Sequence, residues 1–202
     1  IFYKYIAALG GASALARVHS ESVSAERVAS GRTQAETVLR SDGKVALSQG
    51  EGAQSGFDGT SYWSVAGGHA RDLGSDAIGQ LQLEAALYPA AGLKPEGARV
   101  FAQQSVGDRL AYVVAARTPT GVMRYYFDAG NGLLLRVITS TPTYLGALPL
   151  QVDYADYRDQ DGIKLPFDER WSTHDRTWER KISAIKLNPS LDAAAFQAPA
   201  GQ

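Results

Sequence analysis

Cysteine is absent from this sequence of 202 residues. Its absence excludes a disulfide framework, a thiolate zinc site, an iron–sulfur cluster, covalently attached haem and a cysteine nucleophile. An excess of charge of one sign is also missing, since 20 Lys and Arg stand against 21 Asp and Glu, for a formal net charge of −1. A broad nucleic-acid-binding surface normally carries a basic excess, so we expect no nucleic-acid partner.

Long apolar runs are missing as well. No run approaches the roughly 18 residues of a membrane-spanning helix, because Pro89 and Arg136 interrupt the longest candidates. We therefore expect no transmembrane segment in this chain. The 45% of residues that are hydrophobic suffice for a core without metal or disulfide support. The chain begins at Ile1 rather than Met, and we expect a signal peptide or lipid anchor upstream.

Hydrophobic periodicity predicts helices in two places. Apolar residues with three- and four-residue spacing run over residues 1–18 and are interrupted by Gly10-Gly11. We expect a helix there, a break, and a second short helical stretch over residues 13–17. Residues 75–91 form a second amphipathic stretch, which Pro89 helps to end.

Elsewhere the apolar period is two, which is typical of strands. Residues 20–73 and 99–187 are divided into short alternating segments by turn signals such as Asp42-Gly43, and a Pro- and Ala-rich tail covers residues 188–202. Hairpin spacing favours antiparallel pairing over parallel βαβ units. We predict a single α+β, mainly β domain over residues 1–202. It has one strongly curved antiparallel sheet of about 11–12 strands, an incomplete barrel whose concave side is covered by the N-terminal and mid-chain helices.

Motifs that would carry catalysis or metal binding are weak. The three histidines, His19, His69 and His174, lack HExxH or HxH spacing. Asp159-x-Asp161-Gly162 fits a hairpin turn better than a calcium loop. Two SxxK matches lie in a turn and on an alternating strand, without the companion motifs of acyl enzymes. We predict a protein that is not an enzyme, with no catalytic residue, no metal and no cofactor. A pair of carboxylates for glycosidase-type acid–base catalysis stays open, because its geometry is tertiary.

A local concentration of charge precedes the tail. It is interleaved with Trp171 and Trp178 and includes both signs. Its members are Asp168, Glu169, Arg170, Asp175, Arg176, Glu179, Arg180 and Lys181. Because the charges nearly cancel, we favour a salt-bridged surface hairpin over a head-group or partner site.

Large apolar and aromatic side chains are spread over the predicted strands and the mid-chain helix. Those that face inward either fill an ordinary core or line part of a ligand cavity, and the sequence leaves both interpretations open. The candidates for this lining are Trp63, Leu81, Leu87, Tyr112, Met123, Tyr125, Leu135 and Trp171.

Four segments, in order along the chain, resemble LolA-like periplasmic domains, the group found in Acidobacteria and related phyla. They are residues 5–11 (YIAALGG, followed by Leu15 and Ser20), residues 56–60 (GFDGT, with Trp63), residues 126–128 (YFD) with 132–136 (GLLLR), and residues 156–158 (DYR) with 161–167 (DGIKLPF). The resemblance implies the fold of the lipoprotein carrier LolA and its receptor LolB, in which helices form a lid over an apolar cavity. Such carriers bind acyl chains and catalyse nothing.

The resemblance also implies a function. We expect a periplasmic protein that binds a lipid, acyl chain or lipoprotein between sheet and helical lid, with Gly10, Gly11 and Gly74 as candidate lid hinges. An alternative comes from members of this group that are associated with reaction-centre cytochrome subunits. In that case the chain is a haem-free accessory subunit that contacts a membrane-bound electron-transfer or photosynthetic reaction-centre complex.

Overall fold

The structure is a computed structural model that describes residues 1–50, 52–118, 121–143 and 146–199. The fold is mainly β, with 57% of residues in strands. The chain divides into two compact units, unit 1 (Ile1–Arg17 and Ala90–Thr177) and unit 2 (Val18–Pro89 and Trp178–Gln202). No helix within the described ranges is long and apolar enough to cross a membrane.

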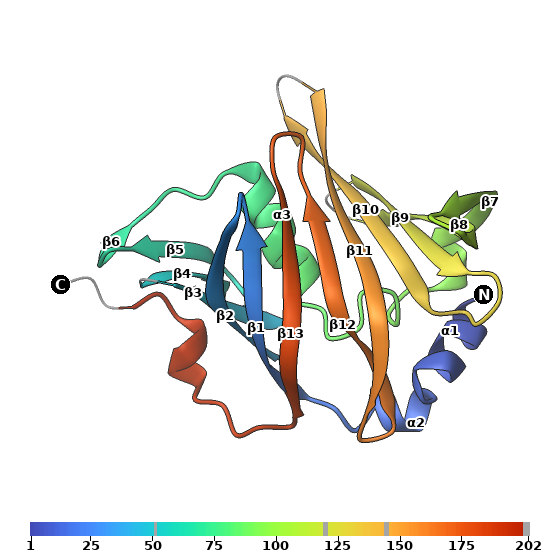
Figure 1. Cartoon of the computed structure of the whole chain (residues 1–202), viewed down its shortest axis with the longest axis horizontal. Helices are drawn as coiled ribbons and strands as arrows, with labels where there is room; N and C mark the ends of the chain where they lie inside the picture. Colours follow the sequence, from blue (N-terminus) through green and yellow to red (C-terminus); the bar gives the residue numbers. More distant parts are fainter. Residues whose placement is uncertain (51, 119–120, 144–145, 200–202) are drawn as a thin grey trace. The chain divides into compact units, whose positions relative to one another are not determined.

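Thirteen strands form one antiparallel sheet that is not closed into a barrel. They are β1 (Ser20–Ala29), β2 (Arg32–Ser41), β3 (Lys44–Gln49), β4 (Ala53–Phe57), β5 (Tyr62–Ala66), β6 (His69–Ala70), β7 (Ala98–Val106), β8 (Arg109–Thr118), β9 (Gly121–Asp128), β10 (Leu134–Thr143), β11 (Gly146–Gln160), β12 (Ile163–Ser172) and β13 (Thr177–Leu187). The order is β6-β5-β4-β3-β2-β1-β13 in unit 2 and β12-β11-β10-β9-β8-β7 in unit 1 (Figure 1). The predicted fold class, a mainly β chain with one antiparallel sheet, is confirmed.

The helices are few and short: α1 (Phe2–Leu9), α2 (Ala12–Leu15) and α3 (Ser75–Glu84), with 3-10 turns η1 (Pro95–Gly97) and η2 (Ala193–Phe196). The predicted break at Gly10-Gly11 is confirmed, because it separates α1 from α2.

Tight turns set the register of the hairpins. Between β2 and β3, Asp42 and Gly43 both have positive φ, 49° and 75°, and Ser41 pairs with Lys44 on either side. Two consecutive positive φ values define the type I′ turn, whose twist matches that of the flanking strands. Asp tolerates this conformation and Gly adopts it freely, so the turn predicted from Asp42-Gly43 is confirmed.

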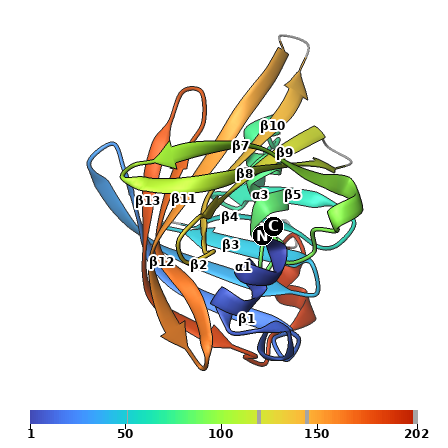
Figure 2. The ribbon, with the colours of Figure 1, turned by 90° about the vertical axis from the view of Figure 1, so that its right-hand side faces the viewer.

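In unit 1, helix α1 packs on β9 and β12. The ring of Phe127 on β9 lies 6.0 Å from that of Phe2 and 5.2 Å from that of Tyr5, both edge to face. Lys4 Nζ donates to the carbonyl oxygens of Ala129 and Gly130 at 2.7 Å. The amphipathic face of α1 is therefore buried, and its exposed lysine ties it to the β9–β10 turn. Figure 2 shows β7 and β8 side by side as a long hairpin of the same unit.

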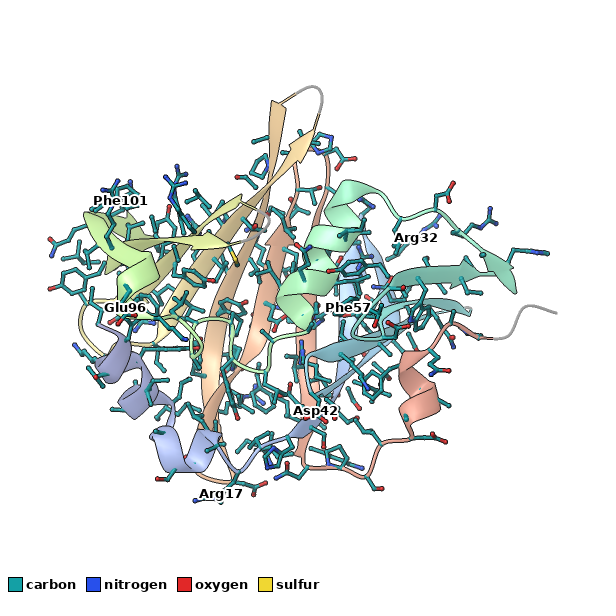
Figure 3. The ribbon with its side chains drawn as sticks, turned by 180° about the vertical axis from the view of Figure 1, so that it is seen from behind. Arg17, Arg32, Asp42, Phe57, Glu96 and Phe101 are labelled. Atoms are coloured by element: carbon teal, nitrogen blue, oxygen red, sulfur yellow. The ribbon has the colours of Figure 1, made fainter. Side chains whose placement is uncertain are left out.

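In unit 2, β1 pairs with β2 and with β13, which comes from the far end of the sequence. Helix α3 contacts β4 (Figure 3) and buries Leu81 and Leu83. The tail also belongs to this interior, since Phe196 of η2 is 3% exposed and its carbonyl oxygen accepts the Trp63 Nε1–H at 2.8 Å.

Helix α3 is shorter than the predicted segment 75–91, since it ends at Glu84. Pro89 explains part of the difference, because a proline disfavours helical geometry in the residue before it. A side chain from the sheet explains the rest. Arg40 Nε donates to the carbonyl oxygen of Glu84 at 2.6 Å, which satisfies a carbonyl that the helix leaves without an internal partner.

Candidate binding site

The side chains predicted to line a cavity or core lie in both units. Unit 1 holds Tyr112, Met123, Tyr125, Leu135 and Trp171, and unit 2 holds Trp63, Leu81 and Leu87. Leu81, Tyr125, Leu135 and Trp171 are at most 4% exposed, and the other four are half-buried. The structure therefore places these residues in two groups, and their role as cavity lining stays a prediction.

Polar atoms of the buried aromatic residues find partners inside unit 1. The Tyr125 hydroxyl lies 3.3 Å from Met123 Sδ, and burial raises the pKa of this hydroxyl to about 12. Trp171 Nε1 donates to the Glu169 carboxylate at 2.9 Å. Such contacts are typical of a packed interior, because a buried N–H or O–H group without a partner is costly.

A network of buried charges lies in unit 2, and sequence reasoning missed it. Arg180 of β13 forms ion pairs with Glu36 of β2 and with Glu84 of α3, the latter at 2.6 Å between Nη2 and Oε1. Arg40 of β2 forms ion pairs with Glu84 and with Glu21 of β1, the latter at 2.7 Å. The side chains of Glu36, Glu84 and Arg180 are at most 1% exposed. Three strands and helix α3 are thus joined by charges shielded from water.

The electrostatics of Glu84 reflect this arrangement. Burial alone would raise the pKa of its carboxyl group, but Arg180 and Arg40 outweigh the desolvation and hold that pKa below its usual value. Glu84 is therefore ionised at neutral pH although it is fully buried. Buried ion pairs add little net stability over apolar packing, whereas loss of one partner is strongly destabilising. The network accordingly fixes where α3 docks.

The prediction of a surface hairpin before the tail is wrong for two residues, Glu169 and Arg180, since Glu169 is buried and accepts the Trp171 Nε1–H. Arg170, Arg176 and Lys181 are exposed, but Arg180 is 0% exposed. The reason is its parity, since Arg180 lies between Trp178 and Ile182 in the alternation of β13 and all three are buried. A charged residue at an inward position of a regular alternation was the signal that could have revealed the network.

A surface pocket of about 550 Å³ lies within unit 1. It is lined by Val106, Gly107, Arg109, Asn131, Leu133, Leu135, Arg136, Asp153, Tyr154, Ala155, Asp156, Tyr157 and Lys164. Leu135 alone among the predicted lining residues belongs to it. The Tyr157 hydroxyl donates to the Leu134 carbonyl oxygen at 2.8 Å; burial raises the pKa of this hydroxyl well above its usual value. This volume falls in the range of small-molecule sites, roughly 300–1,000 Å³.

The predicted hinge glycines differ in their surroundings. Gly10 has φ 130°, and a Cβ there would lie 2.2 Å from the carbonyl oxygen of Gly162. Gly11 has φ 91° and open space around it. Gly74 has φ −68° and ψ 161° at the N-cap of α3, again with open space. Close backbone approach explains the glycine at position 10, whereas the hinge role of all three stays a prediction.

Metal-binding geometry is not found in the part of the chain that the structure describes, where no three His, Asp or Glu side chains are placed around a common point. His19, His69 and His174 are each exposed. In the Asp159-x-Asp161-Gly162 segment, Asp159 Oδ1 accepts the Gly162 N–H at 3.0 Å and Asp161 has φ 54°. These are features of a hairpin turn, as predicted.

No family model matches the sequence, and no curated protein matches it either. Solved structures do match. A LolA superfamily protein from Nitrosomonas europaea superposes with a TM-score of 0.59 and 12% identity over 90% of each chain. A domain assigned to outer membrane lipoprotein sorting, from Vibrio parahaemolyticus, superposes with a TM-score of 0.53 and 11% identity. The match covers 88% of this chain and 89% of that one. A DUF1329 family protein from Desulfovibrio piger superposes with a TM-score of 0.55 and 11% identity over 94% of each chain.

The chain has a LolA-like fold. The likeness spans about nine-tenths of each chain, so it concerns the whole LolA-like arrangement and not a shared hairpin. Because the sequences are only 11–12% identical, the likeness shows a shared fold and nothing more. The alternative association with a cytochrome or reaction-centre complex finds no support in these likenesses.

Proposed function

We propose that this chain is a non-enzymatic periplasmic carrier that binds a lipid, an acyl chain or the acylated end of a lipoprotein between its sheet and its helices. The observation that carries the proposal is the full-length likeness to LolA superfamily and lipoprotein-sorting structures. Burial of an acyl chain against apolar side chains contributes about 25 cal/mol per Å² of apolar surface, so no covalent step and no cofactor is needed.

Helix α3 is the lid in this proposal. Its apolar side chains Leu81 and Leu83 are buried, and they supply an apolar surface against which an acyl chain can pack. Its C-terminal end is held by Glu84 through Arg40 and Arg180. Motion of the lid would then begin at the other end of the helix, near Gly74, while the ionic contacts keep the C-terminal end in place.

The test is the lipid content of the protein purified from its periplasmic fraction. Native mass spectrometry and organic extraction of the same sample should give about one acyl-containing molecule per chain. The control is the same protein after delipidation, which should take up a fluorescent fatty acid at the same stoichiometry. A preparation that carries no lipid and takes up no fluorescent fatty acid would overturn the proposal.

A further inference from the structure

Two residues that line the pocket of unit 1, Arg136 and Asp153, lie on the face of the strands opposite to the one that α1 contacts. Val137 pairs with Tyr125 and with Val152, and Tyr125 stacks on Phe127, the residue that α1 contacts. Neighbouring residues of a strand point to opposite faces. The next residue, Arg136, pairs with Asp153 on β11 and therefore faces away from α1. Arg136 and Asp153 both line the pocket.

Apolar side chains form one wall of this pocket. Leu135 belongs to a buried cluster with Ala111, Val113 and Tyr126, and Val106 packs against the same cluster. Leu135 and Val106 also line the pocket. An apolar wall beside a few polar groups is the usual composition of a small-molecule site.

The carboxylates around the pocket already have cationic partners. Asp153 is held by Arg136 and also accepts from Gln151 Nε2 at 2.9 Å. Asp156 forms an ion pair with Arg158 at 2.5 Å. The negative charges of the lining are thus neutralised by neighbours.

Two cations keep free donors. Arg109 pairs with Asp128 through Nε at 2.6 Å, and the other Asp128 oxygen accepts the Asn131 N–H at 2.7 Å. Asp128 thereby orients the guanidinium and leaves its terminal N–H groups without a partner among the described residues. Lys164 forms no ion pair within the same described part of the chain. The unneutralised charge in the pocket is therefore positive.

We infer that this pocket binds an anionic amphiphile, a molecule with one carboxylate or phosphate group on an apolar body. The anion accepts hydrogen bonds from the terminal N–H groups of Arg109 or from Lys164 Nζ, and the body lies against Leu135 and Val106. Arginine forks and lysine ammonium groups are the usual partners of both anions. This pocket lies within unit 1, whereas α3, the lid of the carrier proposal, belongs to unit 2, so substitutions test the two proposals independently.

Isothermal titration of the full, delipidated chain tests the site. The probes are dodecanoate and dodecyl phosphate below their micelle concentrations, with dodecyltrimethylammonium as the cationic counterpart. We expect the anions to bind and the cation not to bind at this pocket. The tighter of the two anions shows whether a carboxylate or a phosphate suits the site better.

Two substitutions locate the binding. Ala155 is exposed and lines the pocket, so Ala155→Trp should fill it and abolish binding there. Lys164→Gln should weaken anion binding by about tenfold, the loss of one charge-assisted hydrogen bond. Ala184→Trp and Lys186→Gln change exposed residues of β13 in unit 2 and should leave binding unchanged. Thermal melting of each variant confirms that it is folded.

The possible failures are distinguishable from failure of the carrier proposal. Anion binding that Ala155→Trp leaves intact would overturn the pocket assignment and would point to the acyl site instead. Absence of any binding by either anion would also overturn it, while the lipid found with the purified protein still tests the carrier function. Equal binding of the cationic probe, lost on Ala155→Trp, would overturn the anion selectivity.

Discussion

Arg180 and Glu36 stand 144 residues apart in the sequence and form an ion pair whose two side chains are 0% exposed. The pair spans β13 and β2, with β1 between them in the sheet. Glu84 of α3 joins it through Arg180. Arg180 thus connects the two sequence segments of unit 2, since it lies on β13 and pairs with β2 and α3. We therefore expect this residue to be important for the stability of the fold.

Arg180→Met is therefore expected to destabilise the protein strongly. The substitution leaves Glu36 and Glu84 buried without their main cation, and breaking one side of a buried ion pair costs about 3–5 kcal/mol. The measurement is the free energy of unfolding in urea at neutral pH. Lys181→Met, at the exposed neighbouring position, is the matched control and should change that free energy by less than about 0.5 kcal/mol. Equal effects of the two substitutions would refute the structural importance of the network.

Stability should also depend on pH through Glu84. Its pKa is lower in the folded state than its ordinary value of 4.5, because Arg180 and Arg40 outweigh the effect of burial. The unfolded chain then binds the proton more readily, so stability from this group is present above about pH 4.5 and is lost as the pH falls through the folded pKa.

Urea unfolding of the wild type and of Glu84→Gln over pH 3–7, a range around the ordinary carboxyl pKa of 4.5, measures this contribution. We expect the variant to be less stable at pH 7 and the difference between the two proteins to shrink on acidification. The two proteins share the other charged residues of the network, so the pH dependence that these residues contribute largely cancels in the comparison. They are Glu21, Glu36, Arg40 and Arg180. A difference that is constant over the whole range would contradict the lowered pKa.

Gly10→Ala is expected to weaken the docking of the N-terminal helices. The new Cβ would lie 2.2 Å from the Gly162 carbonyl oxygen, at a φ of 130°, so the backbone must move. Gly11→Ala is the matched control, because it shares a positive φ of 91° but has open space around it. Both substitutions carry backbone strain of about 1–3 kcal/mol. Only Gly10→Ala adds the steric clash, so thermal melting should show the larger loss there.

The sequence predicted the parts of this fold that are encoded locally. Alternation located the strands, Asp42-Gly43 marked a turn and Gly10-Gly11 separated two helices, because each of these depends on a few adjacent residues. The pairing of β1 with β13 joins distant segments, and no local pattern encodes it. Arg180 was misplaced although its inward position in the alternation of β13 is a local signal. The identity of its partners is not encoded locally, since they come from β2 and α3.

The candidate sites were harder to predict than the fold. Leu135 was named as a possible cavity residue, and it does line the pocket of unit 1. Arg109, which offers N–H donors beside its ion pair with Asp128, and Lys164, which adds a positive charge, lie on strands β8 and β12. Whether side chains leave a volume unfilled depends on how strands twist and pack, and an amino-acid pattern does not record empty space.

Gly74→Ser tests whether this position is a hinge of the proposed lid. The φ of −68° and ψ of 161° at this N-cap are accessible to serine, and a Cβ at this position would meet no atom within 4 Å. Serine is a good N-cap and restricts the unfolded chain, so the free energy of unfolding should rise by about 0.5–1 kcal/mol.

If Gly74 provides lid motion, the release rate of a bound fluorescent fatty acid from the Gly74→Ser protein should fall severalfold at the same time. Gly92→Ser, in equally open surroundings, should leave that rate unchanged. A more stable Gly74→Ser protein with the wild-type release rate would place the moving joint elsewhere, because stiffening a true hinge must slow the motion that it permits.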